Sequence, residues 1–311
     1  MKTVFSIVVP VFQNEQNLSK TIQCLASLQP ELSEFLIELI LVDDGSLDRS
    51  YEIMVELLKD GNINYRVVKL TKNFGQSAAI QAGLNHSTGD CVGIISADLQ
   101  EPYIKFIDMI AAWKNGSKFV IGERVARYEG HIHKFLSSIY WFFLKKYAFS
   151  DFPRMGYDFC LLDRRLVDEI NLIKEKDTSI FALIYWLGYK PTKVPICRSS
   201  RNLGKSQWTF FKKISFTLTT LVGFTLLPLR LVAFFSLFSS ILSVGYLCYL
   251  IALWARTSTL PPGWMSVIGF LILFGSLTLF SLAVMCEYLL KIMRDGSGRP
   301  LYIVEEVIDN E

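Results

Sequence analysis

The amino-acid sequence predicts an α/β fold, a mostly parallel sheet with helices on both faces, followed by a hairpin of two membrane-spanning helices. Two observations predict this class. In the first half of the 311-residue chain, short apolar runs rich in β-branched residues alternate with segments expected to be helical. From Arg230 to Leu290, charged residues almost vanish. The first pattern is typical of a parallel sheet, and the second is typical of helices that cross a bilayer.

Buried strands and helices are expected to alternate in the soluble part. The expected strands are apolar runs that stop at polar or turn-forming residues. They cover residues 4–10, 36–42, 66–70, 91–96 and 119–121. The expected helices cover residues 17–28, 48–58, 76–85 and 101–113. Pro102 suits the first turn of the last helix, because that turn does not need its missing amide hydrogen.

Charged and amide side chains gather where three of the expected strands end. They are Asp43 and Asp44, Lys72 and Asn73, and Asp98 and Gln100. In a parallel sheet, ligands bind beyond the carboxyl ends of the strands. The pattern alone therefore predicts a functional site at this end of the sheet.

Two apolar stretches, residues 231–255 and 265–290, are long enough to cross a hydrocarbon core of about 30 Å. The short link between them contains helix-breaking proline and glycine. Positive residues flank the pair, namely Lys212, Lys213, Arg230, Lys291, Arg294 and Arg299, whereas the link contains only Arg256. The positive-inside rule then predicts that both termini are cytoplasmic. The alternative, two buried helices of a soluble core, is disfavoured by their length and lack of charge.

Two further stretches, residues 133–149 and 208–227, combine aromatic residues with lysines, as helices at the lipid headgroups do. An ordinary amphipathic helix that faces the core is the alternative for each. The expected organisation is a catalytic domain, a juxtamembrane amphipathic helix, a transmembrane hairpin and a cytoplasmic tail. These parts are expected at residues 1–206, 207–228, 229–292 and 293–311.

Composition and local motifs argue against several other classes of protein. The net charge of +3 gives no electrostatic support for nucleic-acid binding. No two of the six cysteines form a CxxC pair, so we interpret them as reduced. Gly204, Lys205 and Ser206 would complete a phosphate-binding P-loop only if Ser199 were glycine.

Six motifs resemble those of inverting glycosyltransferases of the GT-A fold, specifically the polyprenyl-phosphate glycosyltransferases. They are VPVFQNE at 9–15, VDDGS at 42–46, KNFGQ at 72–76, ADLQEP at 97–102, GER at 122–124 and PLR at 228–230. The resemblance covers nearly the whole chain, including the membrane anchor. Their combination is specific, although each motif alone would be weak.

A divalent metal, Mg²⁺ or Mn²⁺, is expected at Asp98 and Gln100. A nucleotide diphosphate leaving group concentrates negative charge, and hard cations prefer carboxylate and amide oxygens. The two residues lie two apart at a strand end, so their side chains can point the same way. In the family this segment supplies the metal ligands, but usually begins with aspartate where this chain has Ser96. A purely structural role for Asp98 is the alternative.

The resemblance implies that a nucleotide sugar, with UDP expected by analogy, binds at the strand ends. An acidic residue at Asp43 or Asp44 would recognise the base or ribose, unless these residues only form a turn or helix cap. Glu15 is the expected polar contact in the first loop. The residues assigned to the nucleotide sugar are Pro10, Phe12, Glu15, Asp43, Asp44, Lys72, Asn73, Gln76, Ala97, Asp98, Arg201 and Lys205.

Arg124 and Asp158 are the expected catalytic residues. Arg124 matches a family arginine that faces phosphate, and guanidinium groups suit bidentate phosphate contacts. Asp158 matches an aspartate beside the acceptor. A lipid phosphate, whose second pKa is about 6, is already largely ionised at neutral pH. Two roles therefore stay open for Asp158, a base or a group that orients the acceptor or a metal.

The resemblance implies inverting transfer of a sugar to polyprenyl (undecaprenyl) phosphate at the cytoplasmic face of a bacterial inner membrane. Self-association, with a tetramer as one form, and a flippase partner are also expected by analogy. One alternative is a processive polysaccharide synthase, although only Gln207 and Trp208 of its Gln-x-x-Arg-Trp motif are present. The other is a non-catalytic membrane protein that binds nucleotide sugars, which only Ser96 supports.

Overall fold

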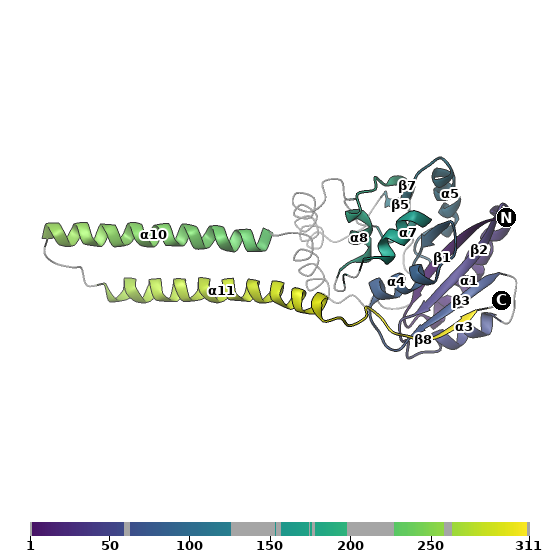
Figure 1. Cartoon of the computed structure of the whole chain (residues 1–311), viewed down its shortest axis with the longest axis horizontal. Helices are drawn as coiled ribbons and strands as arrows, with labels where there is room; N and C mark the ends of the chain where they lie inside the picture. The colour runs from purple at the N-terminus through teal and green to yellow at the C-terminus, as the bar shows by residue number, and fades with distance from the viewer. Residues whose placement is uncertain are drawn as a thin grey trace. The chain divides into compact units, whose positions relative to one another are not determined.

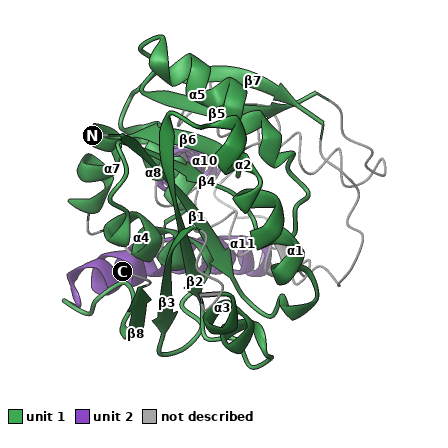
Figure 2. Cartoon of the chain, turned by 90° about the vertical axis from the view of Figure 1, so that its right-hand side faces the viewer, with its two compact units in different colours: residues 1–213, 298–311 green, residues 214–297 purple. Residues whose placement is uncertain are grey.

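Two compact units make up the chain, one of residues 1–213 and 298–311 and one of residues 214–297 (Figure 2). The structure is a computed structural model. It describes residues 2–58, 63–125, 153, 157–173, 175, 178–197, 227–257 and 263–309. Each unit is described by itself.

Within the described residues, the larger unit contains an eight-stranded sheet in the order β7-β5-β6-β4-β1-β2-β3-β8. The strands are β1 (Thr3–Val11), β2 (Phe35–Asp43), β3 (Asn64–Leu70), β4 (Cys91–Ile94), β5 (Phe119–Arg124), β6 (Cys160–Asp163), β7 (Thr192–Ile196) and β8 (Val304–Asp309). Strands β3, β2, β1 and β4 pair in parallel, as do β5 and β7, whereas β6 and β8 are antiparallel to their neighbours. The predicted mostly parallel sheet is therefore confirmed.

Helices cover both faces of this sheet, as predicted. They are α1 (Glu15–Ala26), α2 (Leu28–Glu31), α3 (Ser50–Leu58), α4 (Gln76–His86), α5 (Phe106–Lys114), α7 (Arg164–Asn171) and α8 (Ile180–Trp186), with a 3-10 turn η1 (Tyr103–Lys105). Alternate residues of a strand point to opposite faces. In β1, Ile7 accordingly packs in the cluster that includes residues of α1 and α5, whereas Val8 packs with α4, α7 and α8.

The helix expected at residues 101–113 begins later than its sequence indicates. Pro102 has an extended backbone with ψ of 97°, and the 3-10 turn η1 precedes α5. Glu101 therefore precedes the helix, and its buried side chain contacts the Ser96 hydroxyl.

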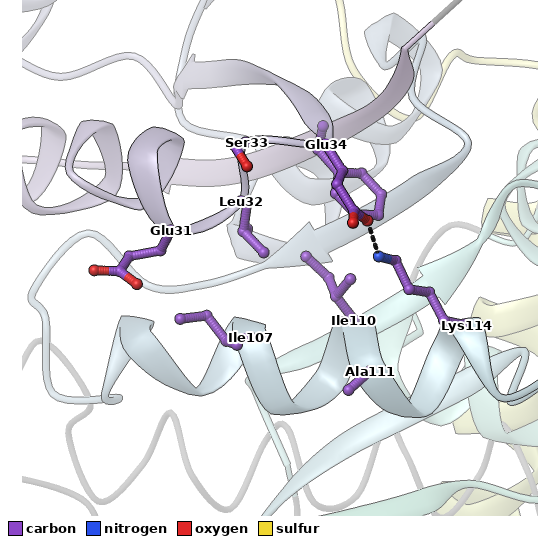
Figure 3. A pocket seen from close by; sticks show the side chains of 9 residues that line it. Glu31, Leu32, Ser33, Glu34, Ile107, Ile110, Ala111 and Lys114 are labelled. Atoms are coloured by element: carbon purple, nitrogen blue, oxygen red, sulfur yellow. Dashed lines mark hydrogen bonds and ion pairs between the residues drawn. The ribbon is translucent and has the colours of Figure 1, made fainter.

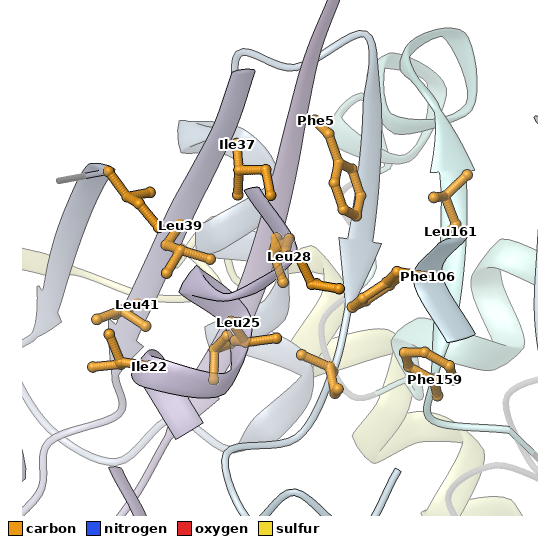
Figure 4. Packing of buried hydrophobic residues seen from close by; sticks show 14 of the residues in the cluster. Phe5, Ile22, Leu25, Leu28, Ile37, Leu39, Leu41, Phe106, Phe159 and Leu161 are labelled. Carbon is orange, nitrogen blue, oxygen red and sulfur yellow. The ribbon is translucent and has the colours of Figure 1, made fainter. Parts of the chain in front are cut away.

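Aromatic rings connect the core to the segment before β6 (Figure 4). The rings of Phe5 and Phe106 meet edge to face with centroids 5.3 Å apart, and those of Phe106 and Phe159 are 4.7 Å apart. All three side chains are fully buried. Because Phe159 follows Asp158 directly, this packing fixes the backbone that carries that carboxylate.

The last strand, β8, pairs antiparallel with β3 and was not expected from the sequence (Figure 1). The ion pairs between the two strands join Arg66 to Asp309 at 2.6 Å and Lys69 to Glu305 at 3.0 Å. The Tyr51 hydroxyl donates a hydrogen bond to Glu306 at 2.6 Å. Acidic residues supply half of β8, so its apolar alternation is weak in sequence.

The smaller unit contains two long helices, α10 (Leu227–Thr257) and α11 (Trp264–Gly296). By length and composition, residues 228–256 and 267–296 are able to cross a membrane, and few of their side chains are buried. The rings of Tyr246 and Phe270 lie 4.9 Å apart and join the two helices. The expected interfacial stretches, 133–149 and 208–227, lie outside the described residues apart from Leu227.

Candidate active site

The loops that follow the parallel strands are tied to one another by polar contacts. The amide of Asn14, after β1, donates a hydrogen bond to the carbonyl of Ala97, after β4, at 2.8 Å. The carboxylate of Glu15 accepts one from the backbone N–H of Arg49, after β2, at 3.1 Å. Glu15, predicted to contact the nucleotide, therefore also holds the loop beside it. Asn14 was not singled out by the sequence analysis.

Asp44 anchors the loop that follows β3. Its two carboxylate oxygens accept hydrogen bonds from the backbone N–H groups of Phe74, at 2.7 Å, and Gly75, at 2.9 Å. The side chain is buried, and this burial raises the pKa of Asp44 to about 6. The two backbone hydrogen bonds oppose that rise in pKa, and the neighbouring charge of Asp43 adds to it.

Asp43 and Gly45 shape the turn that follows β2. The Asp43 carboxylate accepts a hydrogen bond from the backbone N–H of Ser46 at 3.2 Å, and burial raises its pKa. Gly45 has a φ of +67°, and a Cβ built there would lie 2.5 Å from the backbone carbonyl carbon of Lys72. Only glycine allows this approach without strain. The turn-forming role that the sequence left open for Asp43 is therefore present in the structure.

The loop held by Asp44 presents Lys72 and Asn73 at the surface. The Lys72 ammonium lies 5.1 Å from the centre of the Phe74 ring, within range of a cation–π interaction. Gln76 is the first residue of α4. Pro10 lies in β1, and Phe12 follows that strand. These five predicted residues therefore lie at or just beyond the carboxyl ends of β1 and β3.

A compact polar cluster follows β4. The Ser96 hydroxyl lies 2.7 Å from Oδ1 of Asp98 and 2.6 Å from Oε2 of Glu101. The backbone N–H of Gln100 donates a hydrogen bond to the same Asp98 oxygen at 3.2 Å. Leu99 between them has a φ of +52°, an uncommon conformation for a residue with a side chain. Glu101, whose side chain is fully buried, was missed as a candidate site residue.

Arg124 and Asp158 are brought together at the ends of neighbouring antiparallel strands. Nη2 of Arg124 contacts both carboxylate oxygens of Asp158 and lies 3.6 Å from Oε1 of Glu101. The Arg124 side chain is 9% exposed. Among the residues that the structure describes, its Nε has no hydrogen-bond partner. The Nε–H of this buried guanidinium is therefore a polar group that the described residues leave uncompensated.

The donor groups after β4 suit a hard divalent cation. Asp98 offers a carboxylate and Gln100 an amide oxygen, and the backbone N–H of Gln100 already contacts Asp98. In the described part of the chain, no three His, Cys, Asp or Glu residues are close enough to hold a metal by themselves. Mg²⁺ commonly uses one or two carboxylates and takes its other ligands from water and substrate phosphates. The set therefore fits a cation that binds together with a diphosphate.

A separate pocket lies at the opposite end of the sheet (Figure 3). It is lined by residues that precede β2 and by residues of α5, and an ion pair joins Lys114 to Glu34. None of the predicted site residues lines it. Arg201 and Lys205, predicted to contact the donor diphosphate, lie outside the described residues.

Known proteins resemble this chain over nearly its full length. A family model described as "Glycosyl transferase family 2" matches residues 6–170. An uncharacterised glycosyltransferase of Bacillus subtilis is 33% identical, covering 97% of this chain and 93% of the relative. The bactoprenol glucosyl transferase of Shigella phage SfV is 27% identical, covering 96% and 97%. The undecaprenyl-phosphate 4-deoxy-4-formamido-L-arabinose transferase of Salmonella choleraesuis is 28% identical, covering 97% and 93%.

Proposed function

This chain belongs to glycosyl transferase family 2, and from that membership we propose that it transfers a sugar from a nucleotide diphosphate sugar to a polyprenyl phosphate. The observation that carries the acceptor assignment is the extent of the similarity. The two relatives named for bactoprenol and undecaprenyl phosphate match over 96% and 97% of this chain, and so through both apolar helices. UDP is the nucleotide that we propose, by analogy.

The proposed reaction is a direct displacement at the anomeric carbon of the sugar. A phosphate oxygen of the lipid forms the new bond, and the bond from that carbon to the diphosphate oxygen breaks, with inversion. The nucleoside diphosphate leaves with the electron pair. Because the lipid phosphate is already largely ionised, the reaction needs no proton acceptor. The contact of Asp158 with Arg124 then favours a role in orienting groups in the site.

Charge stabilisation at the departing diphosphate is the main task left to the protein. The Arg124 guanidinium is buried, and it retains an N–H without a partner among the described residues. A fixed donor of this kind is worth more in a site that excludes water. Asp98 and Gln100 would hold the divalent cation, which when bound would neutralise charge that develops on the diphosphate. Lys72 is exposed in the loop that Asp44 anchors and is proposed to contact the donor.

Helices α10 and α11 are proposed to anchor the enzyme in the cytoplasmic membrane of a bacterium, with both termini in the cytoplasm. Positive residues before α10 and after α11 support this orientation. The acceptor's hydrocarbon tail stays in the bilayer, so an anchored enzyme remains at the surface where the lipid phosphate is exposed. Self-association and a flippase partner stay predictions.

The proposal is tested with the full chain purified in detergent. The enzyme is incubated with undecaprenyl phosphate, a panel of radiolabelled UDP-sugars and Mn²⁺ or Mg²⁺. We expect label in the chloroform phase only when the lipid phosphate is present, and its loss with a chelator or in Asp98→Ala. A labelled polymer would instead indicate a polysaccharide synthase. Donor binding without turnover in any combination would indicate a non-catalytic protein.

A further inference from the structure

Glu101 links the two halves of the candidate site. Its Oε2 lies 2.6 Å from the Ser96 hydroxyl, which is itself 2.7 Å from Asp98. Its Oε1 lies 3.6 Å from Nη2 of Arg124, which contacts Asp158. The side chain of Glu101 is fully buried. A continuous set of polar contacts therefore runs from the proposed metal ligand to the proposed phosphate-binding arginine.

Burying a carboxylate is costly unless other groups compensate its charge. Glu101 contacts Ser96 and Arg124, which belong to a loop and a strand end of the site. The position of Glu101 is thus explained by the site more directly than by the stability of the core.

On the basis of the function proposed above, we propose that Glu101 is a positioning residue for the divalent cation at Asp98 and for Arg124. In this chain residue 96 is a serine, which brings no charge of its own. Glu101 supplies a second carboxylate to the segment, and its effect reaches the cation through the Ser96 hydroxyl rather than by direct coordination.

The hydrogen count at Ser96 explains how this link works. A serine hydroxyl has one hydrogen to donate, and ionised carboxylates only accept. Asp98 and Glu101 therefore compete for the same hydrogen. If Asp98 coordinates a cation, the Ser96 hydroxyl can still donate its hydrogen bond to Glu101. The negative charge of Glu101 also attracts the cation and holds the guanidinium of Arg124 beside the site.

The test measures metal binding directly, apart from turnover. Free Mn²⁺ is followed by electron paramagnetic resonance while it is titrated into the full chain in detergent with excess UDP. Loss of an outer-shell partner usually weakens metal binding by about 10–100-fold. We expect Glu101→Gln to weaken Mn²⁺ binding by about 10-fold or more. Adding Ser96→Asp to that variant places a carboxylate next to Asp98, and we expect it to restore most of the affinity.

Glu38 offers a matched control. It is a buried glutamate on β2 that contacts the Ser6 hydroxyl and lies 3.7 Å from Arg66. The same serine, glutamate and arginine chemistry thus occurs in mid-strand, away from the carboxyl ends. Glu38→Gln is expected to lower the melting temperature and leave Mn²⁺ affinity unchanged.

The proposal is overturned if folded Glu101→Gln binds Mn²⁺ as the wild type does, or if Glu38→Gln weakens binding equally. Failure of Ser96→Asp to restore binding would also overturn it. If Glu101→Gln does not fold, Ser96→Ala is measured instead, because it breaks the same link, and unchanged binding then refutes the proposal. Wild-type binding of Mn²⁺ and UDP without sugar transfer would instead refute the proposed function alone.

Discussion

Asp44 should make the stability of the catalytic domain depend on pH between about 4 and 7. Burial raises the pKa of this carboxyl from 3.8 to about 6 in the folded chain. The folded state therefore binds the Asp44 proton more tightly than the unfolded chain. The resulting contribution to stability is fully present below pH 4 and is lost as the pH rises through 6. The variant that isolates this contribution is Asp44→Asn, which cannot ionise.

The size of the effect follows from the pKa difference. At about 1.36 kcal/mol for each pKa unit, a rise from 3.8 to about 6 corresponds to about 3 kcal/mol. In a domain of this size, that is roughly 6–12 °C in melting temperature. Asparagine offers one acceptor oxygen to the N–H groups of Phe74 and Gly75, where the carboxylate offers two. In Asp44→Asn, the N–H left without an acceptor lowers the free energy of unfolding by about 1–3 kcal/mol at every pH.

The measurement compares the thermal unfolding of the two full-length proteins in detergent, followed by tryptophan fluorescence at intervals from pH 4.5 to 7.5. We expect the wild type to lose stability relative to Asp44→Asn as the pH rises, because only the wild type then buries a charge. The difference between the two melting temperatures at each pH cancels the effect of titrating groups that both proteins share. Parallel curves over this range, or a relative gain by the wild type, would show that the pKa of Asp44 is not raised in the folded protein.

Three further predictions follow from the same geometry. Gly45→Ala should lower the melting temperature more than Gly188→Ala, because both have positive φ but only a Cβ at residue 45 meets the Lys72 backbone; equal losses would contradict this. Deleting residues 299–311 removes β8, the neighbour of β3 in the sheet. Amide hydrogen exchange in β3 should then accelerate while exchange in β1 stays unchanged. Unchanged exchange in β3 would show that β8 does not protect the amides of β3. Arg124→Lys keeps the positive charge but loses the planar guanidinium. We expect kcat for sugar transfer to fall at least about 10-fold while Mn²⁺ binding is preserved. A normal kcat would show that Arg124 does not act in the site.

The sheet could be predicted because its first five strands contain apolar, β-branched runs that end at polar or turn-forming residues. The strands that were missed have weaker patterns. Strand β6, Cys160–Asp163, has only four residues and ends in a charge. Strand β7, Thr192–Ile196, contains a proline, and β8, Val304–Asp309, is half acidic. Their pairing depends on neighbours far away in sequence, such as the basic residues of β3 that face β8. The local sequence of a short segment with such distant partners gives little indication that it forms a strand.

The candidate site was predicted in part for the same reason. Residues at strand ends, such as Asp44 and Asp98, stand out because polar residues follow apolar runs. Glu101 does not, since a glutamate before Pro102 looks like an exposed residue at a helix start. Only the fold shows that Arg124, distant in sequence, lies beside it and that its side chain is buried. The anchoring of the β3 loop by Asp44 likewise became visible only with the loops in place.

The most direct test of the central claim is the chemical identity of the lipid product. The full chain, undecaprenyl phosphate, Mn²⁺ and each UDP-sugar in turn are allowed to react, and the organic phase is analysed by mass spectrometry and phosphorus NMR. We expect one added sugar per lipid, with the lipid phosphate converted from a monoester to a phosphodiester. A lipid phosphate that remains a monoester with every donor, or sugar found only in a polymer, would contradict it.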